Sequence, residues 1–140
     1  MTSQNGVGYS AICYIPAGVM ATNQQLYERM SGYFLNSLVN DSDKLAIVEA
    51  RVVLLRGRWA LQVGFRNDIL RLATAREIAL PHAQDEAQAE LIDTCAGIFY
   101  LQTALDPEGR YFNDYVGTLE CVQQIVPGAL IFDMAANDFV

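Results

Sequence analysis

The sequence predicts an α+β protein, a two-layer sandwich in which helices cover one face of a mainly antiparallel sheet. Short apolar runs typical of buried strands alternate with segments whose apolar residues recur at helical spacing. Two of the strand-like runs are separated by only two residues, and such a short connection indicates antiparallel pairing. The chain has 140 residues, of which 52% are hydrophobic, which suffices for one buried core. We therefore expect a single globular domain over residues 1–140.

The first strand and the first helix have clear boundaries. Tyr9–Ile15 is a short apolar run that ends at Pro16, as expected of a buried strand. Thr22 can cap the following helix, with Gln25 as its capping-box partner three residues later. The buried stripe of that helix comprises Leu26, Met30, Tyr33, Phe34 and Leu38. The polar cluster at 40–43 then predicts a turn.

The clearest local pattern is a β-hairpin. Leu45–Leu55 and Arg58–Arg66 read as strands on either side of Arg56-Gly57, where Gly57 can adopt a positive φ. Pairing about that turn places Leu54 opposite Trp59, Val52 opposite Leu61, Ala50 opposite Val63 and Val48 opposite Phe65. This register gives one apolar face and one mixed face, which a slip by a single residue would destroy.

The second half of the chain predicts three further helices and two or three strands. Asn67 or Asp68 is expected to cap a helix over Ile69–Ala79, although Leu70–Ala75 could instead continue as a strand. Ala83–Cys95 is the next helix. The remaining elements are a strand at 97–103, a turn at 106–109, an amphipathic helix from Phe112 to its stop at Pro127, a strand at 129–132 and a short strand at 138–140.

The resulting order is β-α-β-β-α-α-β-α-β. This order resembles the start of a ferredoxin-like sandwich with one additional helix–strand unit at the C-terminal end. With helices on one face, the other face of the sheet is expected to be open to solvent or to a partner.

Charge is unevenly distributed along the chain. The formal net charge is −7, yet residues 51–76 carry six arginines against Asp68 alone, a sum of +5. Residues 77–140 carry Arg110 against eleven acidic residues, a sum of −10. Because an acidic protein repels phosphate backbones, the composition predicts that nucleic acid is not a partner.

Other features predict an intracellular protein. Met1–Val7 lacks the features of a secretory signal, and no apolar stretch is long enough to span a membrane. Cys13, Cys95 and Cys121 lie among apolar residues, which favours reduced core residues in the cytoplasm over a disulfide or redox pair. We expect no association with membranes.

Catalytic motifs are scarce. His82, the sole histidine, lies near Asp85 and Glu86, and an imidazole near a carboxylate could act as a general acid or base. The ordinary alternative is a surface residue before a helix whose first turn favours acids. Tyr111 belongs to a compact aromatic group that either packs in the core or lines a binding surface. The sequence contains no nucleophile motif, phosphate loop or metal-ligand spacing, so we expect no cofactor and no metal.

The arginines form a better-organised candidate site. Arg51, Arg58 and Arg66 share the mixed face of the hairpin and surround Val53, Leu55 and Ala60, with Arg56 at the tip. A cationic face with an apolar centre can bind an acidic partner, because arginine donates bidentate hydrogen bonds. The alternative is that the acidic half of the chain neutralises these arginines within the fold.

These patterns favour an interaction protein over an enzyme. One hypothesis is an immunity-type inhibitor that binds a basic partner or toxin through acidic helices at 83–93 and 106–120. Its first contact residues would be Asp85, Glu86, Glu90 and Asp93. A second hypothesis is a homodimer that buries Val53 and Leu55 of the hairpin face. A third is a ligand-binding protein or small enzyme with a site near His82 or Tyr111.

Overall fold

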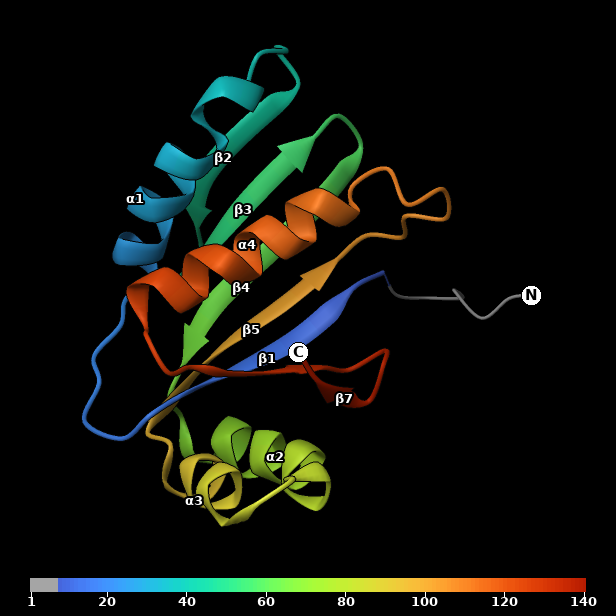
Figure 1. Cartoon of the computed structure of the whole chain (residues 1–140). Coiled ribbons are helices and arrows are strands. Elements are labelled where there is room, and N and C mark those ends of the chain that lie inside the picture. The colour runs from blue at the N-terminus through green and yellow to red at the C-terminus, as the bar shows by residue number, and fades with distance from the viewer. Residues whose placement is uncertain (1–7) are drawn as a thin grey trace.

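A seven-stranded antiparallel sheet forms the centre of the protein in the computed structural model, which describes residues 8–140 (Figure 1). The strands are β1 (Ser10–Ile15), β2 (Asp43–Val48), β3 (Arg51–Arg56), β4 (Trp59–Arg66), β5 (Gly97–Thr103), β6 (Leu130–Asp133) and β7 (Asp138–Phe139). They follow the order β2-β3-β4-β5-β1-β6-β7, and every neighbouring pair is antiparallel. The predicted α+β class with an antiparallel sheet is confirmed. The prediction about Met1–Val7 lies outside the described residues.

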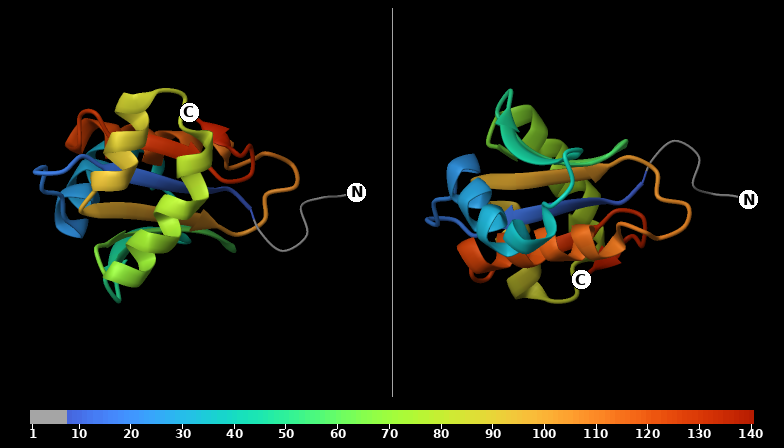
Figure 2. Two further views of the ribbon diagram at one scale, coloured as in Figure 1. Left: turned by 90° about the horizontal axis from the view of Figure 1, so that it is seen from below. Right: turned by 90° about the horizontal axis from the view of Figure 1, so that it is seen from above.

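Helices α1 (Asn23–Phe34) and α4 (Phe112–Ile125) lie side by side over one face of this sheet (Figures 1 and 2). They bury the larger of two hydrophobic clusters, which includes Cys13 of β1, Leu54 of β3 and Leu61 of β4. Thr22 and Gln25 form the capping box that the sequence predicts at the start of α1. These two helices agree with the expected two-layer arrangement.

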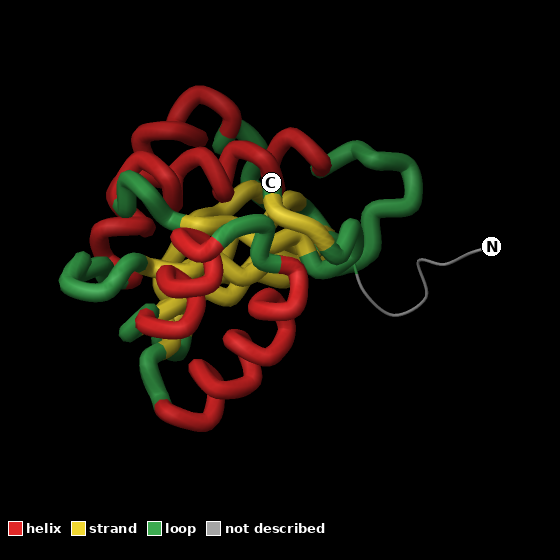
Figure 3. Tube along the Cα trace, turned by 60° about the horizontal axis from the view of Figure 1, so that its bottom comes forward, coloured by secondary structure: helices red, strands yellow, loops and turns green. Residues whose placement is uncertain are grey.

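The other two helices, α2 (Ile69–Ala79) and α3 (Glu86–Thr94), pack on the opposite face of the sheet. In Figure 3, red helical tubes accordingly lie both above and below the yellow strands. The second hydrophobic cluster joins Leu72 and Ile92 of these helices to Ile12, Tyr14 and Phe132 of the sheet. The expectation that all helices share one face is thus wrong for this pair. The reason is that β1 is apolar on both of its sides, so both faces need cover at that place.

Polar side chains start both helices of this second pair. The Asp68 side chain accepts a hydrogen bond from the Arg71 backbone N–H, and the Asp85 side chain accepts one from the Gln88 N–H. Since residues 69–79 are helical, the alternative in which Leu70–Ala75 continues as a strand is wrong. Two short 3-10 turns complete the set of helices, at Leu35–Ser37 and Leu80–His82.

The predicted long strand Leu45–Leu55 is in fact two strands. A two-residue turn at Glu49-Ala50 separates β2 from β3, and both of its residues have positive φ, 50° and 64°. Turns of this kind favour asparagine and glycine, whereas side chains such as these adopt positive φ at a cost. Apolar residues lie on both sides of this turn, so the sequence pattern gives no sign that the strand is interrupted.

The register between β3 and β4 also differs from the predicted one. Leu54 lies opposite Leu61, not opposite Trp59, so the pairing is displaced by two residues and the turn is Gly57-Arg58. Gly57 adopts a φ of 60° there. Because side chains alternate with a period of two, a displacement of two leaves every side chain on its predicted face.

The three cysteines are free and buried, in agreement with their prediction as core residues. Burial raises the pKa of the Cys13 thiol to about 12 and that of Cys121 to about 11. Both thiols are therefore protonated at neutral pH, and protonated thiols are poor nucleophiles. Across residues 8–140, none of the helices has the length and apolar character needed to cross a membrane.

Candidate functional site

Three adjoining hollows lie on the face of the sheet that α2 and α3 cover only in part, between α2 and the strands β3, β4 and β5. Tyr100 of β5 lines all three, and we call them together the Tyr100 groove. Their volumes are about 460, 180 and 580 Å³. The groove is lined by both apolar and polar side chains. The apolar ones include Ile12, Val53, Leu70, Ile78, Ile98 and Met134, and the polar ones include Arg51, Gln62, Arg66, Arg71 and Gln102 with one carboxylate, that of Asp68.

Strand alternation places the polar residues of the groove on this face. Leu61 and Val63 of β4 point into the core beneath α1 and α4, so Gln62 and Arg66 point the other way. On β5 the same alternation turns Phe99 and Leu101 into the core, so Tyr100 and Gln102 lie on the other face of the strand. There Gln102 is the cross-strand partner of Gln62 on β4. The groove is therefore a consequence of the pleat and of the strand order.

Arg51 and Arg66 are held by neutral groups. The Arg51 Nη1 donates to Gln62 Oε1 at 2.6 Å, while the Arg51 Nε is buried and has no hydrogen-bond partner. The Arg66 Nη1 donates to the carbonyl oxygens of Phe65, at 3.0 Å, and of Ala50, at 3.5 Å. Among residues 8–140, neither guanidinium forms an ion pair. Their positive charges therefore have no carboxylate partner within the groove.

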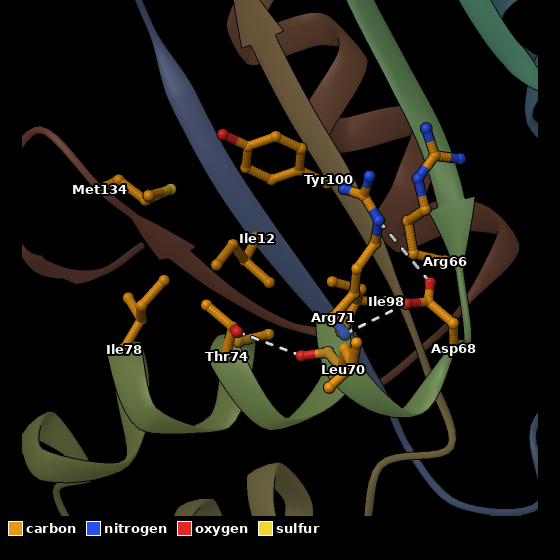
Figure 4. A pocket seen from close by; sticks show the side chains of 11 residues that line it. Ile12, Arg66, Asp68, Leu70, Arg71, Thr74, Ile78, Ile98, Tyr100 and Met134 are labelled. Atoms are coloured by element: carbon orange, nitrogen blue, oxygen red, sulfur yellow. Dashed lines mark hydrogen bonds and ion pairs between the residues drawn. The ribbon is translucent and has the colours of Figure 1, made fainter.

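Arg71 brings a third guanidinium into the groove from the first turn of α2. Its only ion pair in the described part of the chain is with Asp68, at 3.7 Å between Nε and Oδ1, and both side chains are more than half exposed. Arg66, Arg71 and Tyr100 together line two of the hollows, and Figure 4 shows the three side chains in the larger of these two. Adjacent like charges repel, so their proximity favours a bound anion.

The apolar side of the groove extends onto α2. Leu70 lines the same hollow as Arg66, the one of about 460 Å³, and is 80% exposed, and its neighbour Ile69 is 83% exposed. The inner side of α2 is also apolar, because Leu72 and Ala75 are buried against the sheet. The first turn of α2 therefore presents two large apolar side chains to solvent, one of which lines the groove.

Arg56 does not belong to the candidate site. It lies on the core side of the sheet, where it forms ion pairs with Asp43 at 3.5 Å and with Asp114 at 3.1 Å. Its guanidinium also lies 5.6 Å from the centre of the Phe34 ring. For this arginine the predicted alternative holds, since acidic groups within the fold neutralise it.

The remaining predicted residues of the hairpin face are only partly brought together. Val53 lines the groove, and Leu55 lies on the same face, paired with Ala60. Arg58 is in the Gly57-Arg58 turn and lines a separate hollow beside Trp59 and Tyr111. The cationic face thus contains Arg51 and Arg66 but not Arg58, and its third arginine is Arg71 of α2.

The acidic residues predicted to contact a basic partner lie on α3. Asp85 caps the helix, so its carboxylate already accepts a backbone hydrogen bond of 2.8 Å. Glu86, Glu90 and Asp93 are exposed and form no ion pair among the described residues. A basic partner at this helix stays a prediction.

His82 and Tyr111 lie on opposite faces of the sheet and do not form one site. The His82 ring packs near Phe132, with 5.3 Å between ring centres, in the cluster of α2 and α3. Tyr111 stacks on Trp59 at 4.5 Å, beside the cluster of α1 and α4. No group of three or more potential metal ligands occurs in the described part of the chain.

Arg71, Tyr100, Gln62 and Gln102 were not among the predicted site residues. The alternation of the strand at 97–103 could have placed Tyr100 and Gln102 on one face, but not beside the arginines, because that depends on the strand order. A comparison of the chain with protein-family models, curated proteins and solved structures finds no match.

Proposed function

We propose that this chain is an interaction protein that binds an acidic segment of a partner protein in the Tyr100 groove. The observation that carries this proposal is the uncompensated positive charge of Arg51 and Arg66 beside an open apolar surface. Arg71 adds a third guanidinium that is paired only with an exposed aspartate.

Each part of the groove matches one property of such a segment. Guanidinium groups donate paired hydrogen bonds to carboxylates, and these bonds give both orientation and selectivity. The apolar surface formed by Leu70, Ile78 and Met134 would contact aliphatic or aromatic side chains next to the acids. Three adjoining hollows offer an extended chain separate places for successive side chains.

We expect a peptide-display selection against the purified chain to enrich peptides that combine Asp or Glu with apolar residues. The double variant R66Q/R71Q should bind the best of these peptides about tenfold more weakly or worse, because two charge-assisted contacts are lost. Fluorescence polarisation with the labelled peptide measures this change, and raised salt should weaken the wild-type complex.

The matched control is R58Q/R110Q, which removes the same charge from exposed arginines outside the groove. This variant should bind the selected peptide within twofold of the wild type. Peptides enriched without acidic residues, or binding that R66Q/R71Q leaves unchanged, would contradict the proposal.

A second candidate is self-association through the hairpin face. It is favoured by the apolar character of that face, where Val53 lines the groove and Ala46 lies opposite it on the edge hairpin. If a second copy covers this face, V53E/L55E should be a folded monomer under conditions in which the wild type is a dimer. Light scattering coupled to size-exclusion chromatography measures the mass of each. A wild type that stays monomeric at high concentration would exclude this candidate.

A further inference from the structure

We infer that Arg51, Arg66 and Arg71 form a subsite for a phosphorylated side chain within the bound segment. This inference rests on the proposed function and names the chemical group that the smallest hollow of the Tyr100 groove, about 180 Å³ in volume, would accept. All three arginines line that hollow, together with Gln62, Tyr100 and Gln102.

Charge balance favours a phosphate over a carboxylate. The three arginines carry three positive charges, and the ion pair with Asp68 offsets one of them. A phosphorylated side chain carries about −1.5 to −2 at pH 7 and has three acceptor oxygens, whereas a carboxylate carries −1 and has two. The remaining charge in the hollow is therefore matched by a dianion.

Both glutamine side chains of the hollow already use their oxygen atom in a hydrogen bond within the protein. Gln62 uses its Oε1 to accept from Arg51, and Gln102 uses its Oε1 to accept from the Tyr100 hydroxyl at 3.3 Å. Each side-chain amide then retains its NH₂ group, which has no partner among the described residues. Five side chains that present N–H groups and no free carboxylate form a lining selective for anions.

Contacts within the fold hold Arg51 and Arg66 in place. A Cβ atom on Gly64 would lie 3.1 Å from Arg66 Nη1 and 3.2 Å from Arg51 Cβ, so glycine makes room for both side chains across β4. The Ala50 carbonyl, in the turn with positive φ, accepts from Arg66 and also from Asn23 Nδ2 at 2.8 Å. Groups held in place lose less entropy on binding, which strengthens the complex.

The test uses three matched peptide libraries that differ only at a central residue, which is phosphoserine, glutamate or serine. We expect the phosphoserine peptides to bind at least about tenfold more tightly than the glutamate peptides, and the glutamate peptides more tightly than the serine ones. In R51M the preference for phosphoserine over glutamate should fall to about twofold or less, while R58Q/R110Q should keep it. Thermal unfolding of each variant verifies that it is folded.

The outcomes separate this inference from the proposed function. Equal affinity for phosphoserine and glutamate peptides, both above serine, would overturn the phosphate subsite and leave the acidic segment supported. Equal affinity for all three libraries would overturn both. Inorganic phosphate that binds the chain as tightly as the phosphopeptides would also overturn the inference, because the site would then take free phosphate instead of a segment.

Discussion

Replacing Arg56 with methionine is expected to lower the free energy of unfolding by about 3 kcal/mol. The side chains of Arg56 and Asp43 are 11% and 7% exposed, and Asp114 is 17% exposed. Methionine preserves most of the side-chain volume but leaves two nearly buried carboxylates without their cation. The loss also removes the hydrogen bonds that Arg56 donates to the Ser37 carbonyl and hydroxyl oxygens, both at 2.8 Å.

Urea denaturation followed by circular dichroism measures this difference. Arg58, two residues further along the same hairpin, is exposed, so R58M should change stability by less than about 0.5 kcal/mol. Adding D114N to R56M should restore part of the stability, because the neutral amide costs less to bury without a cation. Equal stabilities of R56M and R58M would show that the ion pairs of Arg56 do not stabilise the fold.

The variant F132A is expected to lose about 4 kcal/mol of stability. Phe132 of β6 is fully buried in the second hydrophobic cluster, where its ring packs against those of His82 and Phe139. Its removal would leave a cavity beneath α2 and α3, and α2 forms one wall of the Tyr100 groove. We therefore also expect weaker binding of the selected acidic peptide.

Phe112 gives the control for this variant, because it is 48% exposed on α4 and belongs to the opposite side of the sheet. Its replacement by alanine should cost about 1 kcal/mol, in proportion to the smaller apolar area that it buries. Thermal or urea unfolding compares the two. If F132A were no less stable than the Phe112 variant, the second cluster would not be a core.

The charge asymmetry of the sequence is only partly neutralised inside the fold. Asp114 pairs with Arg56, and Arg76 donates to the backbone carbonyls of Ile92 and Cys95. These two contacts join the basic segment to the acidic half of the chain. Arg51, Arg66 and the acidic side chains of α3 form no ion pair in the described residues, so both charged regions are available to partners.

The sequence by itself predicted where the helices and most of the strands lie and which side of the hairpin is apolar, but it joined β2 and β3 into one strand. The prediction of which hairpin residues lie on the polar side holds although the register differs by two residues, because side chains alternate between the two faces of a strand with a period of two. The turn at Glu49-Ala50 could not be predicted, since it contains none of the residues that favour a positive φ. The turn is stabilised by hydrogen bonds that the Ala50 carbonyl accepts from Asn23 and Arg66, both remote in sequence.

Only the tertiary structure decided which helices cover which face and which residues meet in the groove. Both sides of β1 are apolar, so local patterns allow helices on either face, and the packing of Leu72 and Ile92 settles the matter. Arg51, Arg71 and Tyr100 come together because β3, β4 and β5 are neighbours and α2 begins where β4 ends. Strand order depends on contacts between distant segments, and no local periodicity contains that information.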